Sequence, residues 1–434
     1  MRSVMLARRD VGSDDWWREV AQRGTPWVEP HSPGFCAVTF LWRDPIGSGR
    51  ASAIRRVWVY ICGMTDHHSR TAPQSLARID GTDVWCWQTI LGSGWRGSYC
   101  FIPCCDNAAF SGLASGEPLD PVALRDGWRG VLSGAVADPL NPLPAWTGGR
   151  GHQVSGLHMP QAPAQTAWAT FDRVGPLAGR TLPPLPAPAS LERHRWQSEL
   201  LGNSRDVWIF TTGLRQATRR PVALLLDGQF WARQMPLWSP LIALTQSGEL
   251  PAAVYVLVDA IDTRQREREL TCNPAFWQAV RLELLPQVAK WAPYRADAAS
   301  TVVVGQSFGG LSAMYAALHW PRLFGCVLSQ SGSFWWPNRD VTSKGRADAS
   351  CRLLADIDHG LGAGQGLKLF IEAGAREPLV RQVNDRAVEA LRFAGHQVDY
   401  RIVDGGHDAL CWRGGLLDGL VALWGGLFGT IKSV

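Results

Sequence analysis

The segment Thr301–Gly310 places a serine between glycines at the spacing used in nucleophilic acyl transfer. It reads Thr-Val-Val-Val-Gly-Gln-Ser-Phe-Gly-Gly, so Ser307 is the centre of a G-x-S-x-G pattern. An apolar run leads into the pattern and helix-forming residues 311–318 lead out of it, which is the strand–turn–helix context of a nucleophile elbow. The alternative is a glycine-rich turn with a chance serine. The pattern and its context predict Ser307 as the nucleophile of a hydrolase.

A serine hydroxyl needs an adjacent base before it can attack a carbonyl. In hydrolases with this elbow the base follows the last strand of the sheet. Here the apolar run 398–403 is followed by Asp-Gly-Gly and then His407. His396 and His319 fall at expected helix ends and are interpreted as structural. His407 is therefore the predicted general base.

The acid that orients the base is expected after the penultimate strand. That strand is predicted at 367–373, and Glu377 is the first carboxylate beyond it. Glu377 is therefore the predicted acid, and a Ser–His dyad without an acid is an alternative. The competing carboxylates are Glu372, Asp385, Asp404 and Asp408.

The oxyanion of an acyl-transfer intermediate needs two backbone donors. One is expected to be the N–H of Phe308, directly after the nucleophile. The second is expected from the loop 226–231 after an early strand, where Gly228 permits a turn and the Gln229 N–H becomes the donor. Asp227 in this loop is either a brace or an ordinary turn carboxylate.

The elements that must position these residues follow a regular alternation after about residue 190. Continuously apolar runs alternate with helical patterns, which indicates a mostly parallel sheet flanked by helices. The predicted strands are 206–211, 221–226, 253–258, 301–304, 325–328, 368–371 and 398–403, and the clearest helices are 274–291, 310–318 and 381–394.

The first third of the chain shows a different pattern, with short runs rich in Val, Ile, Trp, Tyr and Phe between Gly, Asp and Ser turns. No long helical pattern interrupts these runs, so an all-β sandwich domain is predicted over residues 1–180. A proline-rich linker is predicted at 181–195 and the catalytic domain at 196–434. The predicted strands of the first domain are 37–42, 56–62, 84–91 and 98–103.

Composition narrows the class of function. A net charge of +5 without a Lys/Arg block argues against nucleic-acid binding and favours an anionic small molecule. No apolar run is long enough for a transmembrane helix, so no membrane insertion is expected. The N-terminal residues contain no apolar stretch of signal-peptide length, and the ten cysteines are irregularly spaced, which favours reduced thiols in the cytoplasm. No ligand spacing predicts a metal site or cofactor.

Five sequence blocks in order resemble the enterochelin (enterobactin) esterase family. They are 226–231, 261–273, 305–310, 373–378 and 405–416. The resemblance extends to 38–43 and 138–142 in the first domain and so covers nearly the whole chain. It departs from the family at 180–188 and 338–350.

The resemblance implies an α/β hydrolase preceded by a β-sandwich domain. It further implies cytoplasmic hydrolysis of the ester bonds of a catecholate siderophore, a cyclic trilactone of 2,3-dihydroxybenzoyl-serine that usually carries Fe(III). Iron then enters only with the substrate. Because such a complex is aromatic and trianionic, arginines and a tryptophan are expected to bind it. The expected substrate-binding residues are Arg266, Arg376, Trp412 and Arg413.

Two other interpretations remain open. The first is a general acyl-ester hydrolase resembling the esterase D or feruloyl esterase groups, which share the elbow but lack the Arg266 to Asn273 and Cys411-Trp412-Arg413 blocks. The second is a siderophore-binding protein without catalytic activity, which would have no need for an elbow together with a Gly-Gly-His loop.

Overall fold

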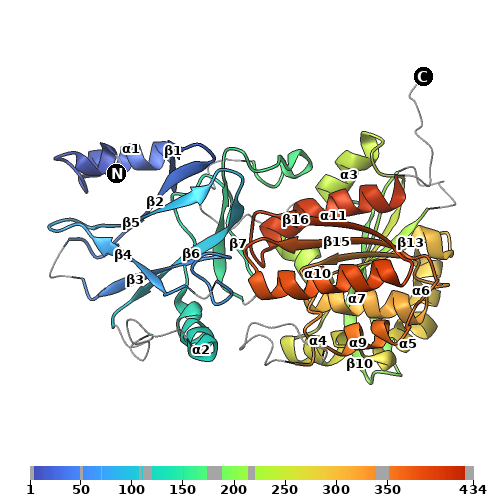
Figure 1. Cartoon of the computed structure of the whole chain (residues 1–434). Coiled ribbons are helices and arrows are strands. Elements are labelled where there is room, and N and C mark those ends of the chain that lie inside the picture. The colour runs from blue at the N-terminus through green and yellow to red at the C-terminus, as the bar shows by residue number, and fades with distance from the viewer. Residues whose placement is uncertain are drawn as a thin grey trace. The chain divides into compact units, whose positions relative to one another are not determined.

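The computed structural model forms two compact units (Figure 1). The first unit comprises Met1–Ala164, Phe171–Pro183 and Asp404–Cys411, and the second comprises Gln165–Thr170, Pro184–Val403 and Trp412–Val434. The structure describes residues 4–48, 52–69, 71–106, 110, 120–149, 151–173, 188–213, 220–338 and 351–425. Part of the predicted linker (181–187) and most of the divergent segments 180–188 and 338–350 lie outside these residues.

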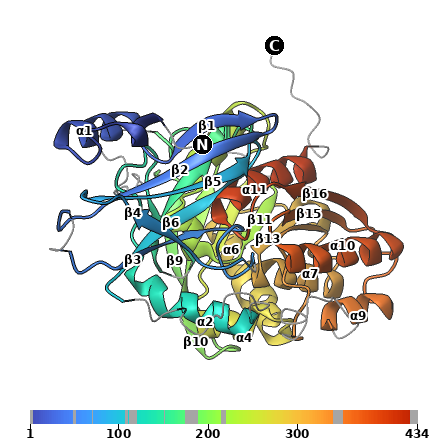
Figure 2. The ribbon, with the colours of Figure 1, turned by 60° about the vertical axis from the view of Figure 1, so that its left-hand side comes forward.

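The first unit is built on one eight-stranded antiparallel sheet, in the order β1-β2-β5-β4-β3-β6-β8-β7. Figure 2 shows β1, β2 and β5 side by side. The strands are β1 (Trp27–Ser32), β2 (Phe35–Arg43), β3 (Arg56–Ile61), β4 (Gln74–Arg78), β5 (Val84–Gly92), β6 (Arg96–Cys104), β7 (Trp146–Thr147) and β8 (Gln153–His158).

This sheet closes over a core in the manner of a sandwich. Pairing within the sheet is weakest at β4, which pairs with β5 at only two residue pairs. Strands on either side of β4 then share one buried cluster, which includes Val38 and Phe40 from β2 and Val57 and Val59 from β3. The predicted sandwich is confirmed.

Two helices correct the prediction that this domain is all-β. Helix α1 (Asp14–Arg23) is capped by Ser13, whose Oγ accepts the Trp16 N–H, and it buries Trp16 and Trp17. Helix α2 (Pro121–Val131) starts with proline in its first turn after an aspartate cap. Ser and Asp caps and an N-terminal proline are helix-start signals, and the sequence prediction overlooked them.

The second unit has a mostly parallel sheet in the order β16-β15-β14-β13-β11-β12-β10-β9, with only β9 and β10 antiparallel to their neighbours. Its fold is that of an α/β hydrolase, as predicted. Its strands are β9 (Leu191–Ser198), β10 (Asn203–Thr211), β11 (Val222–Leu225), β12 (Val254–Val258), β13 (Thr301–Gln306), β14 (Cys326–Gln330), β15 (Lys368–Gly374) and β16 (Gln397–Val403).

Helices cover both faces of this sheet, with α3 and α11 on one face and α7 and α10 on the other (Figure 1). Leu328 and Phe370 lie within reach of Gly419 on α11, whereas Leu369 and Ile371 belong to the core that α7 and α10 share. Burial of both faces explains the continuously apolar strands. The helices are α3 (Trp238–Gln246), α4 (Thr263–Leu270), α5 (Pro274–Ala279), α6 (Leu285–Trp291), α7 (Phe308–His319), α9 (Arg352–Asp358), α10 (Pro378–Phe393) and α11 (Ala409–Trp424).

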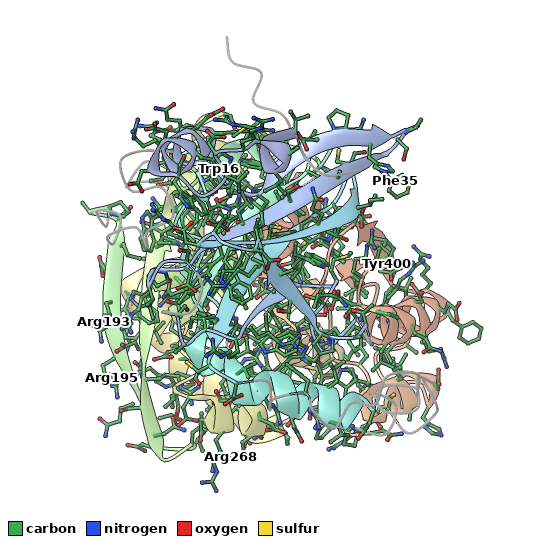
Figure 3. All side chains as sticks on the ribbon, turned by 90° about the vertical axis from the view of Figure 1, so that its left-hand side faces the viewer. Trp16, Phe35, Arg193, Arg195, Arg268 and Tyr400 are labelled. Carbon is green, nitrogen blue, oxygen red and sulfur yellow. The ribbon has the colours of Figure 1, made fainter. Side chains whose placement is uncertain are left out.

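Strand β9 begins inside the predicted linker and was not predicted as a strand. It lies at the edge of the sheet. Buried and exposed side chains alternate near its end, where Trp196 and Ser198 are buried. Arg193 and Arg195 project outward from it (Figure 3) and both pair with Asp206 on β10. Charged side chains are common on edge strands because they discourage pairing with other chains.

Among the described residues, no helix is both long and apolar enough to span a membrane.

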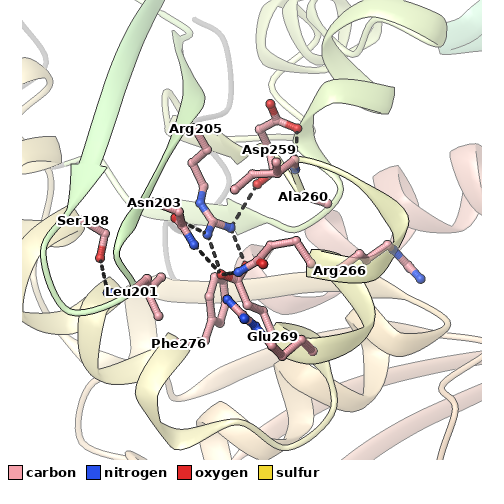
Figure 4. Close-up of polar contacts among 12 residues, drawn as sticks. Ser198, Leu201, Asn203, Arg205, Asp259, Ala260, Arg266, Glu269 and Phe276 are labelled. Atoms are coloured by element: carbon pink, nitrogen blue, oxygen red, sulfur yellow. Dashed lines mark hydrogen bonds and ion pairs between the residues drawn. The ribbon is translucent and has the colours of Figure 1, made fainter.

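A buried ion pair joins β10 to α4 (Figure 4). Both terminal nitrogens of Arg205 donate to the Glu269 carboxylate at 2.6 Å, and both side chains are at most 2% exposed. Glu269→Ala would leave a buried guanidinium without its counter-charge. We expect it to lower the free energy of unfolding by about 3–5 kcal/mol, measured by chemical denaturation.

The control for this substitution is the exposed pair of Arg386 and Asp358, whose side chains are 41% and 45% exposed. Asp358→Ala is expected to cost less than about 1 kcal/mol. Equal losses for the two variants would show that burial does not set the strength of the Arg205 pair.

Candidate active site

The predicted nucleophile elbow is present between β13 and α7. Ser307 has φ 58° and ψ −119°, a conformation that non-glycine residues rarely adopt. A Cβ on Gly305 would lie 2.2 Å from the carbonyl carbon of Gly309, and one on Gly310 would lie 2.6 Å from the Ser329 hydroxyl. A Cβ on Gly309 would meet only ordinary contacts, the nearest at 3.5 Å. The glycines that the packing requires are therefore Gly305 and Gly310.

The backbone around Ser307 is held by the neighbouring strand β14. The Ser307 N–H donates to the Gln330 carbonyl (2.9 Å), and the Ser333 N–H donates to the Ser307 carbonyl (3.0 Å). The Ser307 hydroxyl is partly exposed and lies 3.2 Å from the Ser333 hydroxyl. Phe308 is the first residue of α7, so its N–H belongs to the helix turn whose donors lack intrahelical partners. The hydroxyl and one predicted oxyanion donor thus share one turn.

The second predicted donor lies in the loop after β11. This loop passes so close to β12 that a Cβ on Gly228 would lie 2.3 Å from the carbonyl carbon of Leu257. The Gln229 side chain then accepts the Ala260 N–H at 3.0 Å. Both contacts fix the backbone that carries the Gln229 N–H, as an oxyanion donor requires.

Asp227 braces this loop, which decides between its two interpretations. It has a positive φ of 55°, and its two carboxylate oxygens accept from Nε and Nη2 of Arg266 at 2.6 and 2.7 Å. Arg266 Nη2 also lies 3.3 Å from the Gln306 carbonyl. Burial would lower the pKa of Arg266, but the Asp227 carboxylate outweighs it and raises that pKa. The pair therefore ties the loop after β11 to the residue before Ser307.

Glu377, the predicted acid, is a buried carboxylate at the start of α10. Its Oε1 accepts from the Ser331 hydroxyl (2.6 Å) and from the Gly374 N–H (3.0 Å). The Trp412 indole N–H donates to the same Ser331 hydroxyl at 2.9 Å. Glu377 follows β15 and Ser307 follows the parallel strand β13, so both lie at the carboxyl edge of the sheet.

Three of the four competing carboxylates have other partners. Glu372 is buried beneath α11, accepts from Gln330 and pairs with Arg401. Burial raises the pKa of Glu372, and Arg401 partly opposes that rise. Asp385 accepts the Tyr400 hydroxyl, and Asp408 accepts the Ser98 N–H and hydroxyl within the first unit. These arrangements favour Glu377, whose role as the acid stays a prediction.

His407 lies in the segment Asp404–Cys411, which is part of the first unit. Its ring packs on that of His68, with centroids 5.1 Å apart. A Cβ on Gly406 would lie 2.7 Å from the Gly63 nitrogen, so the Gly-Gly pair permits a close approach. His407 follows β16 by four residues, which limits its distance from the end of that strand to about 14 Å. Its pairing with Ser307 stays a prediction.

The predicted substrate-binding residues differ in accessibility. Arg413 is fully buried, donates from Nε to Gln165 and stacks on Trp168, and its contact with substrate stays a prediction. Arg376 and Trp412 are half-buried and remain predicted contacts. The guanidinium of Arg266 is engaged by Asp227, and any contact with substrate is an addition to that role.

Two serines after β14 were missed by the sequence prediction. Ser331 has a positive φ of 49° and joins Trp412 to Glu377, while Ser333 lies against Ser307. Their position in the sequence could have indicated them, because both closely follow β14, the neighbour of the strand β13 that leads into Ser307. In a parallel sheet that position belongs to the same edge as the nucleophile.

Glu377→Gln tests the assignment of the acid. The amide keeps the shape and can still accept from Ser331, but it does not stabilise an imidazolium. We expect kcat to fall roughly 10²- to 10⁴-fold with the melting temperature little changed. Steady-state kinetics and thermal unfolding measure the two effects.

Glu249→Gln is the matched control, since Glu249 is exposed and its contact is with Ser247. It should leave kcat unchanged. If Glu377→Gln retained activity within a few-fold of the unaltered protein, the acid would lie elsewhere or the site would be a dyad.

Comparison with known proteins gives one consistent result. The family model described as "Enterochelin esterase, N-terminal" matches residues 37–168, and the one described as "Putative esterase" matches residues 198–423. The iron(III) enterobactin esterase of Escherichia coli O6:H1 is 52% identical over 418 residues, which cover 96% of this chain and 98% of that protein.

Two solved structures are similar over nearly the same length. The ferric enterobactin esterase from Salmonella typhimurium has a TM-score of 0.86 at 50% identity and covers 96% of this chain and 99% of its own. The enterobactin esterase from Shigella flexneri, solved in the presence of enterobactin, has a TM-score of 0.83 at 50% identity and covers 96% of this chain and 100% of its own.

Proposed function

The chain belongs to the enterochelin (enterobactin) esterase family, and we propose that it hydrolyses the ester bonds of a catecholate siderophore such as ferric enterobactin. The observation that carries this proposal is the strained Ser307 elbow in a chain that matches iron(III) enterobactin esterases along both units. Cleavage of the trilactone loosens the hold of the ligand on Fe(III), which supports intracellular iron release.

The chemistry follows from the roles proposed for these groups. Ser307 Oγ attacks a lactone carbonyl carbon while its proton moves to His407, and the carbonyl oxygen becomes an oxyanion held by the Phe308 and Gln229 N–H groups. The tetrahedral intermediate then breaks the ester C–O bond, and the leaving serine alkoxide takes the proton from His407. An acyl group remains on Ser307.

The second half of the cycle frees the enzyme. Water gives a proton to His407 and attacks the acyl carbon, and collapse of the second intermediate returns the proton to Ser307 Oγ. Glu377 is proposed to hold the His407 tautomer and to stabilise the imidazolium in both halves. Neither half needs a protein-bound metal or cofactor, so iron is proposed to enter only with the substrate.

Substrate recognition is proposed to use cationic and aromatic side chains at the site. Arg376 and Trp412 are half-buried neighbours of the Glu377 network, and Arg266 lies beside the oxyanion loop. An arginine offers charge and a planar face to a catecholate, and a tryptophan offers a ring for stacking. The net charge of +5 suits a trianionic ligand.

The cytoplasm is the proposed compartment. All ten cysteines are among the described residues, where none forms a disulfide, and seven of them are buried. Cysteines in this number without a disulfide suit a reducing environment. Hydrolysis of the imported complex in that compartment would release iron where it is used.

Product analysis tests the proposal. The purified protein is incubated with apo-enterobactin, ferric enterobactin and simple acyl esters, and the products are identified by mass spectrometry. We expect linear dihydroxybenzoyl-serine oligomers and monomer from the siderophore. Turnover of the simple esters alone would reject the siderophore and favour a general acyl-ester hydrolase.

A further inference from the structure

The turn after β3 brings together three side chains of types that bind metals, and none of them has a role in the proposed hydrolysis. Asp66, His67 and His68 are consecutive, and one ligand atom from each lies within 4.8 Å of the other two. Metal–nitrogen and metal–oxygen bonds of about 2.0–2.2 Å place the ligands of one ion roughly 3–4 Å apart. Small side-chain rotations would bring these three atoms onto one ion.

The backbone of this turn is fixed before any ligand arrives. The Thr65 hydroxyl donates to the Val59 carbonyl (2.7 Å) and accepts the Ile61 N–H (2.8 Å), which ties the turn to β3. Asp66 Oδ1 accepts the N–H groups of His68 and Ser69 at 3.2 and 3.1 Å. A rigid turn keeps the entropy cost of assembling a site low.

The Asp66 carboxylate gives an independent indication of a cation. Its side chain is 0% exposed, and its Oδ2 accepts no hydrogen bond of good geometry from the described residues, although the Gly63 N–H and the Cys62 thiol lie close enough to the carboxylate to stabilise its charged form. A buried carboxylate oxygen without a partner is costly, and a bound cation would offset that cost. The two imidazoles are the neighbouring groups that could hold such a cation.

His67 also has the support that metal-binding histidines usually have. Its Nδ1 lies 3.0 Å from the Tyr60 hydroxyl. In the tautomer whose Nδ1–H donates to this hydroxyl, the lone pair is on Nε2 and can bind a metal, and an outer-shell partner of this kind orients the ring. The His68 ring packs against His67, with centroids 4.0 Å apart, and against His407, with centroids 5.1 Å apart.

We propose that Asp66, His67 and His68 form a binding site for one divalent transition-metal ion, of the Fe²⁺, Co²⁺ and Zn²⁺ class. Two imidazoles and one carboxylate suit these ions better than Mg²⁺ or Ca²⁺, which prefer oxygen ligands. No metal site is predicted from the sequence, because three adjacent ligands match none of the common ligand spacings. Metal binding at this turn would overturn that prediction. The proposal does not depend on the proposed hydrolysis, although the His68 ring packs on that of His407, the proposed base.

Cobalt titration tests the site. Full-length protein without a histidine tag is freed of metal with a chelator, dialysed and titrated with CoCl₂. We expect one equivalent to bind with visible d–d absorption and to be displaced by Zn²⁺. His67→Ala and His68→Ala should each weaken binding by at least roughly tenfold, and Tyr60→Phe by about tenfold through loss of outer-shell support.

His31→Ala is the matched control, because His31 is an exposed histidine of the same unit. It should bind Co²⁺ as the unaltered protein does. Thermal unfolding of each variant checks the fold, and Tyr60→Phe keeps the test valid if a histidine variant unfolds. The proposal is overturned if no stoichiometric Co²⁺ binds, if both histidine variants keep full affinity, or if thiolate charge-transfer bands move the ion to cysteines.

Discussion

Ser307→Ala is expected to lower kcat for siderophore ester hydrolysis by roughly 10⁴- to 10⁶-fold, the range found when the nucleophile of a serine hydrolase is removed. The loss is large because the variant cannot form the acyl intermediate. Binding of the ferric siderophore should change little, since the hydroxyl acts mainly in the transition state. Turnover followed by mass spectrometry and binding followed by tryptophan fluorescence quenching measure the two quantities.

The control is Ser247→Ala, because Ser247 is exposed at the end of α3 and contacts only its own turn and Glu249 among the described residues. It should leave both quantities unchanged. The result for Ser307→Ala also separates an enzyme from a binding protein. Wild-type turnover by this variant would show that Ser307 is not the nucleophile.

His407→Ala is expected to cause a loss of similar size, roughly 10⁴- to 10⁶-fold in kcat, because the nucleophile and base act as a unit. The same reasoning predicts strong non-additivity. The double variant Ser307→Ala/His407→Ala should be no slower than Ser307→Ala alone. Rates for the two single variants and the double variant give this comparison directly.

His359→Ala serves as the control, since His359 is exposed at the end of α9. If His407→Ala kept most of its activity, the base would be another group. Additive losses in the double variant would mean that Ser307 and His407 act in separate steps.

The sequence predicted those parts of the fold that local pattern determines. The parallel strands are buried on both faces and so appear as continuous apolar runs, and the elbow motif places Ser307 through its own glycines. Strand β9 was not predicted because its sequence, Leu-Glu-Arg-His-Arg-Trp-Gln-Ser, is mostly polar and charged. Such a sequence suits a strand only at the edge of a sheet, where the arginines reach solvent. Its stability comes from pairing with β10, which local sequence does not reveal.

The site was predicted less completely because the partners of a side chain depend on distant elements. Arg266 has the residue type and position of a substrate contact, but its guanidinium faces Asp227, 39 residues earlier. Arg413 lies in the block that resembles the family, yet it is buried beside Trp168. Ser331 joins Trp412 to Glu377 through contacts that no spacing rule contains. Tertiary packing decides all three.

The central claim is that Ser307 is the nucleophile that opens the siderophore ester. Labelling with a fluorophosphonate, followed by peptide mass spectrometry and a turnover assay, tests it most directly. We expect one adduct, on Ser307, with siderophore turnover lost in proportion to labelling and with apo-enterobactin protecting the residue. Full labelling of Ser307 with turnover retained, or inactivation by an adduct on another residue, would contradict it.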